Sequence, residues 1–188
     1  MAVLPILITG SPVLHTPARD VTLFDDTLAR LVADMFETMA LAPGVGLAAP
    51  QVGVGLRVFV YNYVDDDDTL WRGVAINPTL LIEPVHVSPA DDEADSEGCL
   101  SVPGERYPLN RSARAVLSAV DLNGVQTEIT ATGWLARIFQ HEFDHLGGVL
   151  YVDRLEHLHG KLARREIRKN SWGVPDLSWT PGVDDLES

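Results

Sequence analysis

Two histidines, His141 and His145, stand four residues apart, and Glu142 directly follows the first of them. On a helix this spacing puts both imidazoles on one face, where they can bind one metal ion while the carboxylate moves protons of a bound water. The alternative is that these are ordinary residues of a solvated helix surface. The chain has only 6 histidines, so two of them in register beside Glu142 favour a metal-dependent hydrolase.

A catalytic metal site of this kind takes three protein ligands and a water, so the third ligand has to come from another segment. Cys99 is the only cysteine and has no disulfide partner within the chain. It lies in the stretch 97–101, Glu-Gly-Cys-Leu-Ser, where Gly98 allows the backbone to approach another group closely. Taken alone, Cys99 is best interpreted as a buried free thiol.

A third segment changes that interpretation. Residues 44–51, Gly-Val-Gly-Leu-Ala-Ala-Pro-Gln, form a loop of small residues that, by itself, indicates only a tight turn against the core. Taken together and in this order, the segments 44–51, 97–101 and 140–145 resemble the motifs of the peptide deformylases. The similarity continues through residues 146–154 and covers most of the chain up to about Leu155.

The resemblance implies a role for each motif residue. It assigns three metal ligands, Cys99, His141 and His145. Glu142 would be the general acid and base, Gln51 and the backbone N–H of Leu100 would donate hydrogen bonds to the formyl oxygen, and Gly46 would shape the site. The reaction implied is hydrolysis of the formyl group from the N-terminal formyl-methionine of newly made polypeptides, with release of formate.

One thiolate and two imidazoles suit zinc, but they also suit ferrous iron, cobalt and nickel. Similar members of the family use Fe2+ by preference, with Zn2+, Ni2+ or Co2+ as substitutes. We therefore expect Fe2+, and loss of activity in air as the thiolate or the ferrous ion is oxidised.

A methionine side chain needs an apolar pocket beside the metal. Together with apolar residues of the histidine helix, the motifs offer as pocket residues Val45, Gly46, Leu47 and Leu100. Arg106 matches a family position near the entrance, where it would contact the substrate backbone; the alternative is a surface arginine paired with Glu105 or Glu97. Glu97 itself is expected to orient a neighbouring group of the site.

The histidine motif lies on a predicted helix. Apolar residues recur there at helical spacing, namely Trp134, Leu135, Ile138, Phe139, Phe143 and Leu146. Thr132 is the expected N-cap, and Gly147-Gly148 ends the helix. A second helix is predicted from a cap at Asp25 to just before Pro43, and a third over residues 155–169.

Strands dominate the rest of the sequence. They are predicted over residues 57–62, 73–76, 79–85, 113–122 and 125–131. Asn123-Gly124 indicates a tight hairpin between the last two, and Asp65–Asp68 is predicted to be a solvated loop. Mostly antiparallel strands around a central helix with the HExxH-type motif make an α+β fold, as in deformylases. We expect one catalytic domain over residues 1–170 and a tail, 171–188, that caps a surface or is mobile.

The net charge of −13 argues against generic binding to DNA or other nucleic acid. The predicted last helix is an exception, with five cations, Lys161, Arg164, Arg165, Arg168 and Lys169. One interpretation is a solvated helix face, on which the helix dipole favours cations toward the C-terminal end. The other is a contact with the ribosome, because some bacterial deformylases dock there through a C-terminal helix. The N-terminus lacks the features of a signal peptide, no apolar run reaches membrane-spanning length, and a single cysteine fits a reducing compartment, so a cytoplasmic location is expected.

Two other functions share parts of this pattern. A zinc metallopeptidase would also carry the histidine–glutamate helix, but it takes a downstream carboxylate or histidine as third ligand instead of Cys99. A protein with a structural metal would close the site with a fourth protein ligand and would not need Glu142.

Overall fold

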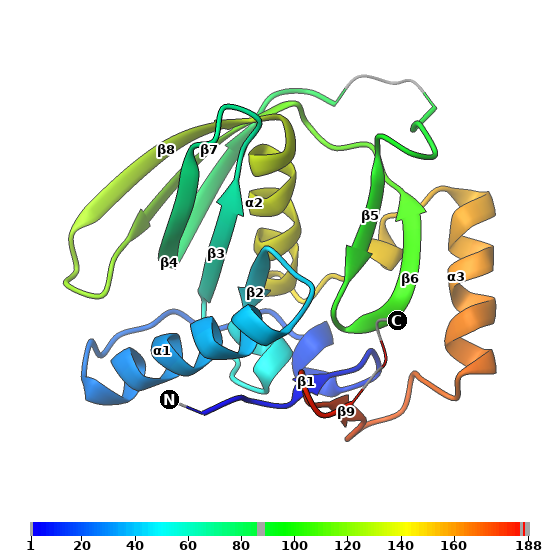
Figure 1. Cartoon of the computed structure of the whole chain (residues 1–188), viewed down its shortest axis with the longest axis horizontal. Coiled ribbons are helices and arrows are strands. Elements are labelled where there is room, and N and C mark those ends of the chain that lie inside the picture. Colours follow the sequence, from blue (N-terminus) through cyan, green and yellow to red (C-terminus); the bar gives the residue numbers. More distant parts are fainter. Residues whose placement is uncertain (1, 86–88, 185, 187–188) are drawn as a thin grey trace.

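The computed structural model describes residues 2–85, 89–184 and 186. Its main sheet is antiparallel, with the strand order β2-β3-β4-β7-β8. Those strands are β2 Gly46–Ala48, β3 Val58–Val64, β4 Leu70–Ile82, β7 Arg114–Val120 and β8 Gln126–Thr132. Two small antiparallel sheets pair β1 Ile6–Leu7 with β9 Ser178–Trp179 and β5 Ser96–Cys99 with β6 Val102–Pro108. The α-helices are α1 Asp26–Leu41, α2 Gly133–Leu146 and α3 His157–Lys169 (Figure 1).

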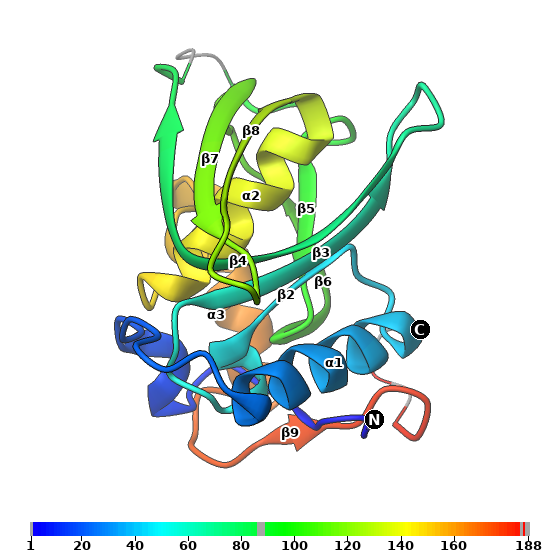
Figure 2. The ribbon, with the colours of Figure 1, turned by 90° about the vertical axis from the view of Figure 1, so that its left-hand side faces the viewer.

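Helix α2 is the centre of the molecule. The main sheet curls around it (Figure 2), and α2 contacts every strand of that sheet. Its apolar residues at helical spacing, such as Leu135 and Phe139, pack there against Phe59 and Leu117 from β3 and β7. On its other side lies the β5–β6 hairpin (Figure 1). The predicted α+β fold with a central helix is therefore confirmed.

The predicted helices are all present. The Asp25 carboxylate accepts hydrogen bonds from the backbone N–H groups of Thr27 and Leu28, both at 3.0 Å, and so caps α1 as expected. Thr132 does occupy the N-cap position of α2, but its hydroxyl makes no capping hydrogen bond. Helix α2 ends before Gly147, and Gly148 then adopts a φ of +74°, which suits glycine.

The strand prediction needs three corrections. It omits the short strands β1, β5, β6 and β9. Residues 73–76 and 79–82, predicted within two separate strands, belong to the single strand β4, which ends at Ile82, so that residues 83–85 lie beyond it. Asn77, with a φ of +49°, marks a shift of register between Ile76 and Thr79, so the strand bulges there without ending. The segment 44–51, expected to be a loop, instead contains strand β2 and a short 3-10 helix, Ala49–Val52.

Both turn predictions hold. Asn123 and Gly124 lie in the tight connection between β7 and β8, and Asp121 accepts hydrogen bonds there from the backbone N–H groups of Asn123 and Val125. The acidic loop that begins at Asp65 joins β3 to β4. These hairpins set the register of the sheet that surrounds α2.

Helix α3 begins at His157, two residues later than predicted, and packs against β6 with Gly160 and Ala163 buried. The chain then returns to the N-terminal segment, where Trp179 of β9 pairs with Ile6 of β1 and is 3% exposed. No helix in the described part of the chain is both long and apolar enough to cross a membrane.

Candidate active site

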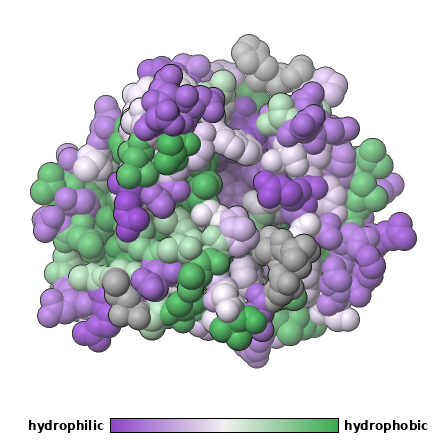
Figure 3. Space-filling view, in the orientation of Figure 1, coloured by the Kyte–Doolittle hydropathy of each residue, from purple (hydrophilic) through white to green (hydrophobic). Residues whose placement is uncertain are grey.

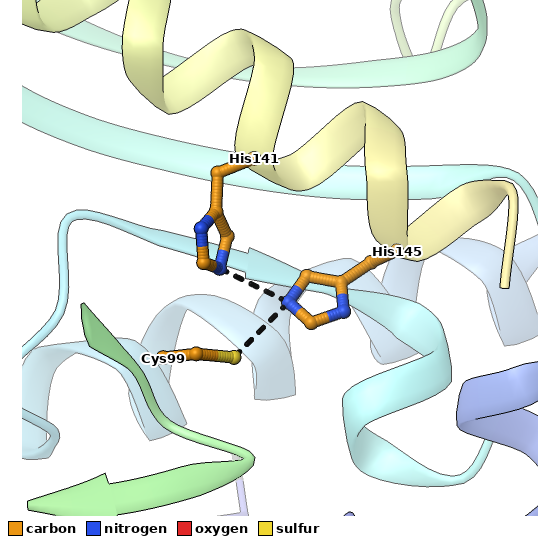
Figure 4. A group of neighbouring side chains, drawn as sticks. All are labelled: Cys99, His141 and His145. Atoms are coloured by element: carbon orange, nitrogen blue, oxygen red, sulfur yellow. Dashed lines mark hydrogen bonds between the residues drawn. The ribbon is translucent and has the colours of Figure 1, made fainter. Parts of the chain in front are cut away.

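Cys99, His141 and His145 meet between β5 and α2 (Figure 4). The Nε2 atom of His145 lies 3.4 Å from Sγ of Cys99 and 3.2 Å from Nε2 of His141. One ligand atom from each residue lies within 4.8 Å of the other two, and all three residues are buried. The structure thus brings together the three predicted ligands, although Cys99 is 42 positions before His141 in the sequence.

The donor set fits a metal ion. A thiolate and two imidazoles suit a borderline divalent cation such as zinc or ferrous iron. The Nδ1 atom of His141 faces the Glu97 carboxylate at 2.7 Å, which leaves Nε2 to point toward the other two side chains. Burial alone would lower the pKa of His141, but the negative charges of Cys99 and Glu97 raise it well above its usual value. These acidic neighbours favour positive charge at His141, whereas burial and the charges of His141 and Arg111 lower the pKa of His145 well below its usual value.

Glu142 presents its carboxylate next to this group. The residue is 4% exposed, and its Oε2 atom has no hydrogen-bond partner within the described residues. Burial raises the pKa of the Glu142 carboxyl to about 7. A carboxyl group with this pKa can both accept and donate a proton near neutral pH, as a general acid and base must.

Gln51 approaches the site from the short 3-10 helix. Its Oε1 accepts a hydrogen bond from the backbone N–H of Ala48 at 2.8 Å, which fixes the orientation of the amide. The Nε2 donor therefore points to the opposite side, 3.8 Å from Sγ of Cys99 and 3.4 Å from Oγ of Ser101. An N–H donor is thus held beside the predicted ligands.

A cavity of about 210 Å³ opens beside these side chains. In Figure 3 a hollow is visible near the middle of the molecular face, between the region of the main sheet and that of the β5–β6 hairpin. Four of the predicted substrate-binding residues line this cavity, namely Val45, Gly46, Leu100 and Arg106. The side chain of Arg106 packs across Gly98, its partner on the neighbouring strand. Trp134 and Ile138 of α2 add apolar surface to the same cavity.

Leu47, which we also expected to line the pocket, does not. Successive side chains of a strand point to opposite faces, so that Gly46 faces Glu142 while Leu47 faces the core. Leu47 is 0% exposed and packs in one cluster with Met35 and Met39 of α1.

A network of buried charges surrounds the site. Glu97 accepts hydrogen bonds from Arg111 at 2.6 and 3.1 Å and from Arg137 at 3.1 Å, while Arg111 also donates to Asp144 at 2.6 Å. Burial would raise the pKa of Glu97, but hydrogen bonds and charges from His141 and Arg111 hold it well below its usual range. Glu97 is thus a carboxylate that fixes the ring of His141.

Sequence reasoning missed most of this network. Arg137 and Asp144 lie four residues before and three residues after His141, so helical spacing puts all three on one face of α2. Two opposite charges on the face that carries the histidines could have indicated the network. Arg111 gives no such signal, because it lies in the irregular segment between β6 and β7.

The sequence profile of the family described as "Polypeptide deformylase" matches residues 3–161. The peptide deformylase of Tropheryma whipplei (strain TW08/27) is 52% identical over 95% of this chain and 94% of its own length. For peptide deformylase 2 of Corynebacterium efficiens the identity is 50%, over 98% and 96% of the two chains.

Solved structures agree. The crystal structure of a peptide deformylase from Legionella pneumophila has a TM-score of 0.76 and 40% identity, and covers 90% of this chain and 96% of that one. The deformylase from Ehrlichia chaffeensis in complex with actinonin has a TM-score of 0.78 and 35% identity, with 90% and 98% covered. This chain therefore belongs to the peptide deformylases, the metal-dependent hydrolases that remove N-formyl groups from nascent polypeptides.

Proposed function

We propose that this chain hydrolyses the formyl group of N-terminal formyl-methionine with Glu142 as its general acid and base and with Cys99, His141 and His145 as its metal ligands. The observation that carries the proposal is the convergence of the three ligand atoms within 4.8 Å of one another beside the buried carboxylate of Glu142. The structural-metal alternative does not account for Glu142, a buried carboxylate with an unpartnered oxygen.

The proposed metal ligands come from two elements, Cys99 from β5 and both histidines from α2. When bound there, a divalent ion supplies Lewis acidity and lowers the pKa of a water molecule toward neutrality. Glu97 orients His141 through the 2.7 Å contact with Nδ1, so that Nε2 remains available as the ligand atom.

Glu142 carries the proton through the reaction. Its carboxylate accepts a proton from the attacking water as a new C–O bond forms at the formyl carbon. It then donates that proton to the amine nitrogen as the C–N bond breaks, which yields formate and a peptide with a free amine. The Gln51 amide and the backbone N–H of Leu100 donate hydrogen bonds to the formyl oxygen as negative charge develops on it.

The methionine side chain is proposed to enter the cavity of about 210 Å³. Val45, Leu100, Trp134 and Ile138 supply apolar lining, and Gly46 leaves room for the Glu142 carboxylate against β2. Arg106 at the lining of the same cavity is proposed to contact the substrate backbone.

We propose Fe2+ as the ion used in the cell because similar members of the family prefer it. Zn2+, Ni2+ or Co2+ are proposed substitutes, since a thiolate and two imidazoles accept all four ions. The proposed location of the protein is the cytoplasm, where new polypeptides emerge.

The cations of α3 support a second proposal, that the helix docks on ribosomal RNA. All five are exposed, as are Leu158 and Leu162, while Gly160 and Ala163 face the protein.

The direct test of the reaction is formate release from a formyl-methionyl peptide, measured anaerobically on protein whose metal content is known. Stoichiometric formate and free amine support the proposal, and cleavage of an internal peptide bond instead would favour a metallopeptidase.

For the ribosome proposal, the full chain is pelleted with ribosomes. Alanine at all five cations of α3 should lower the bound fraction, whereas equal pelleting would remove that idea.

A further inference from the structure

The site's third ligand is followed by a two-residue turn. Cys99 ends β5 and pairs with Val102 of β6, so Leu100 and Ser101 make the connection between the strands. The peptide groups of such a turn lie outside the ladder of the hairpin, and other parts of the protein have to satisfy them. The orientation of the Leu100 backbone therefore depends on what holds this turn.

Two segments far away in the sequence hold it. The backbone N–H of Thr9 donates to the carbonyl of Ser101 at 2.8 Å, and the indole Nε1 of Trp179 donates to the carbonyl of Leu100 at 2.8 Å. Trp179 is 3% exposed and packs in the same core cluster as Leu100. The N-terminal and C-terminal segments thus fix the two consecutive carbonyls of the turn.

Strand pairing fixes the indole in turn. Trp179 lies opposite Ile6 in the β1–β9 pair. The backbone N–H of Ile8 donates a hydrogen bond to the carbonyl of Leu177 at 2.9 Å. In Figure 1, β1 and β9 lie beside the end of the β5–β6 hairpin that carries the turn. The family profile ends at residue 161, so Trp179 belongs to a part of the chain outside the profile.

We infer that Trp179 is a positioning residue for deformylation, which holds the Leu100 turn so that the N–H of Leu100 faces the developing negative charge. The inference rests on the proposed role of that N–H group. The hydrogen bond is made to the carbonyl of the same residue, and small displacements of a catalytic donor have large effects on rate. The tail after α3 is in this view part of the catalytic apparatus, although it contributes no group to the reacting atoms.

Three variants separate positioning from packing. Trp179→Phe keeps an aromatic ring but removes the N–H donor. Trp179→His keeps a ring N–H, since Nε2 of imidazole occupies the same place in the five-membered ring as Nε1 of indole, but it removes more packing. Trp172→Phe is the matched control, because Trp172 is a partly buried indole of the same tail that packs against the core.

Formate release, metal content and thermal unfolding are measured for the wild type and all three variants, with kinetics recorded well below the lowest unfolding midpoint. We expect kcat of Trp179→Phe to fall about tenfold with little change in KM and full metal content. Trp179→His should unfold at a lower temperature than Trp179→Phe and still have a higher kcat than that variant. Trp172→Phe should keep the kcat of the wild type.

A kcat of Trp179→Phe equal to that of Trp172→Phe would overturn the inference. So would a kcat of Trp179→His below that of Trp179→Phe, because the order would then follow packing and not the donor. If none of the four proteins, the wild type included, releases formate, the proposed function itself is wrong, an outcome that is distinct from a difference between variants.

Discussion

Gly46 of β2 lies directly against the carboxylate of Glu142 on α2. A Cβ atom added at Gly46 would lie 2.3 Å from Oε1 and 2.7 Å from Cδ of Glu142, closer than real Cβ contacts. Helix α2 and strand β2 pack against each other here, so neither backbone can move away from the other without disturbing the core. The position of the proposed proton carrier therefore depends on the absence of a side chain at residue 46.

Gly46→Ala should displace the Glu142 carboxylate and lower formate release about a hundredfold. Because residue 46 does not contribute a ligand atom, the metal content should stay that of the wild type. Gly55→Ala is the control, since a Cβ there would meet only Val13 Cγ2 at an ordinary 3.6 Å. Wild-type kcat in Gly46→Ala would show that the carboxylate tolerates displacement, contrary to its proposed role.

Glu97→Gln should weaken metal binding about 10- to 100-fold, the usual effect of losing a carboxylate that orients a ligating histidine. The 2.7 Å contact between Glu97 and Nδ1 of His141 is the reason. Competition with a chelator measures the affinity. Glu83→Gln, at an exposed carboxylate paired with Arg114, should leave the affinity unchanged; equal affinities of both variants would refute the role of Glu97.

Arg111→Met should destabilise the protein by about 3 kcal/mol, the lower end of the range for breaking a buried ion pair, because Glu97 keeps Arg137 and Asp144 keeps Arg154. The Arg111 side chain is 6% exposed and bridges Glu97 and Asp144. Arg114→Met is the control. That side chain is 48% exposed, and loss of its ion pair should change the free energy of unfolding by less than about 1 kcal/mol. Chemical denaturation compares the two, and similar losses would contradict this account of the network.

Local sequence patterns were sufficient for the helices and for most of the main sheet. The apolar spacing around Leu135 and Phe139 predicts α2, and Asp25 marks the start of α1, because both signals act within one or two turns of a helix. The strands β1 and β9 have two residues each, too few for any alternation to be visible. Their pairing depends on contacts between the two ends of the chain.

The site residues likewise fall into those that a local pattern predicts and those that it does not. The spacing of His141, Glu142 and His145 is a property of one helix, whereas Cys99 came into the account only through resemblance to a family. Leu47 was misplaced because an expected loop is in fact a strand, in which neighbours face opposite ways. The indole of Trp179 reaches Leu100 across 79 positions of sequence, and no local pattern could have indicated that contact.

Iron-loaded enzyme should lose activity in aerated buffer, while nickel-loaded enzyme should retain it. Ferrous iron next to the Cys99 thiolate is open to oxidation, whereas a nickel ion under the same conditions is not readily oxidised. Samples loaded anaerobically with either ion are exposed to air, and formate release is followed over hours. Iron-loaded enzyme that keeps full activity throughout would contradict the expected sensitivity.

Metal content and formate release, measured together on Glu142→Gln and Cys99→Ala, test the central claim most directly. The account predicts that Glu142→Gln binds as much metal as the wild type but releases formate at least about a thousandfold more slowly, because a general acid and base is lost. Cys99→Ala should lose both the metal and the activity. Formate release by Glu142→Gln at the wild-type rate, or full metal content in Cys99→Ala, would contradict the claim that these residues form the catalytic metal centre.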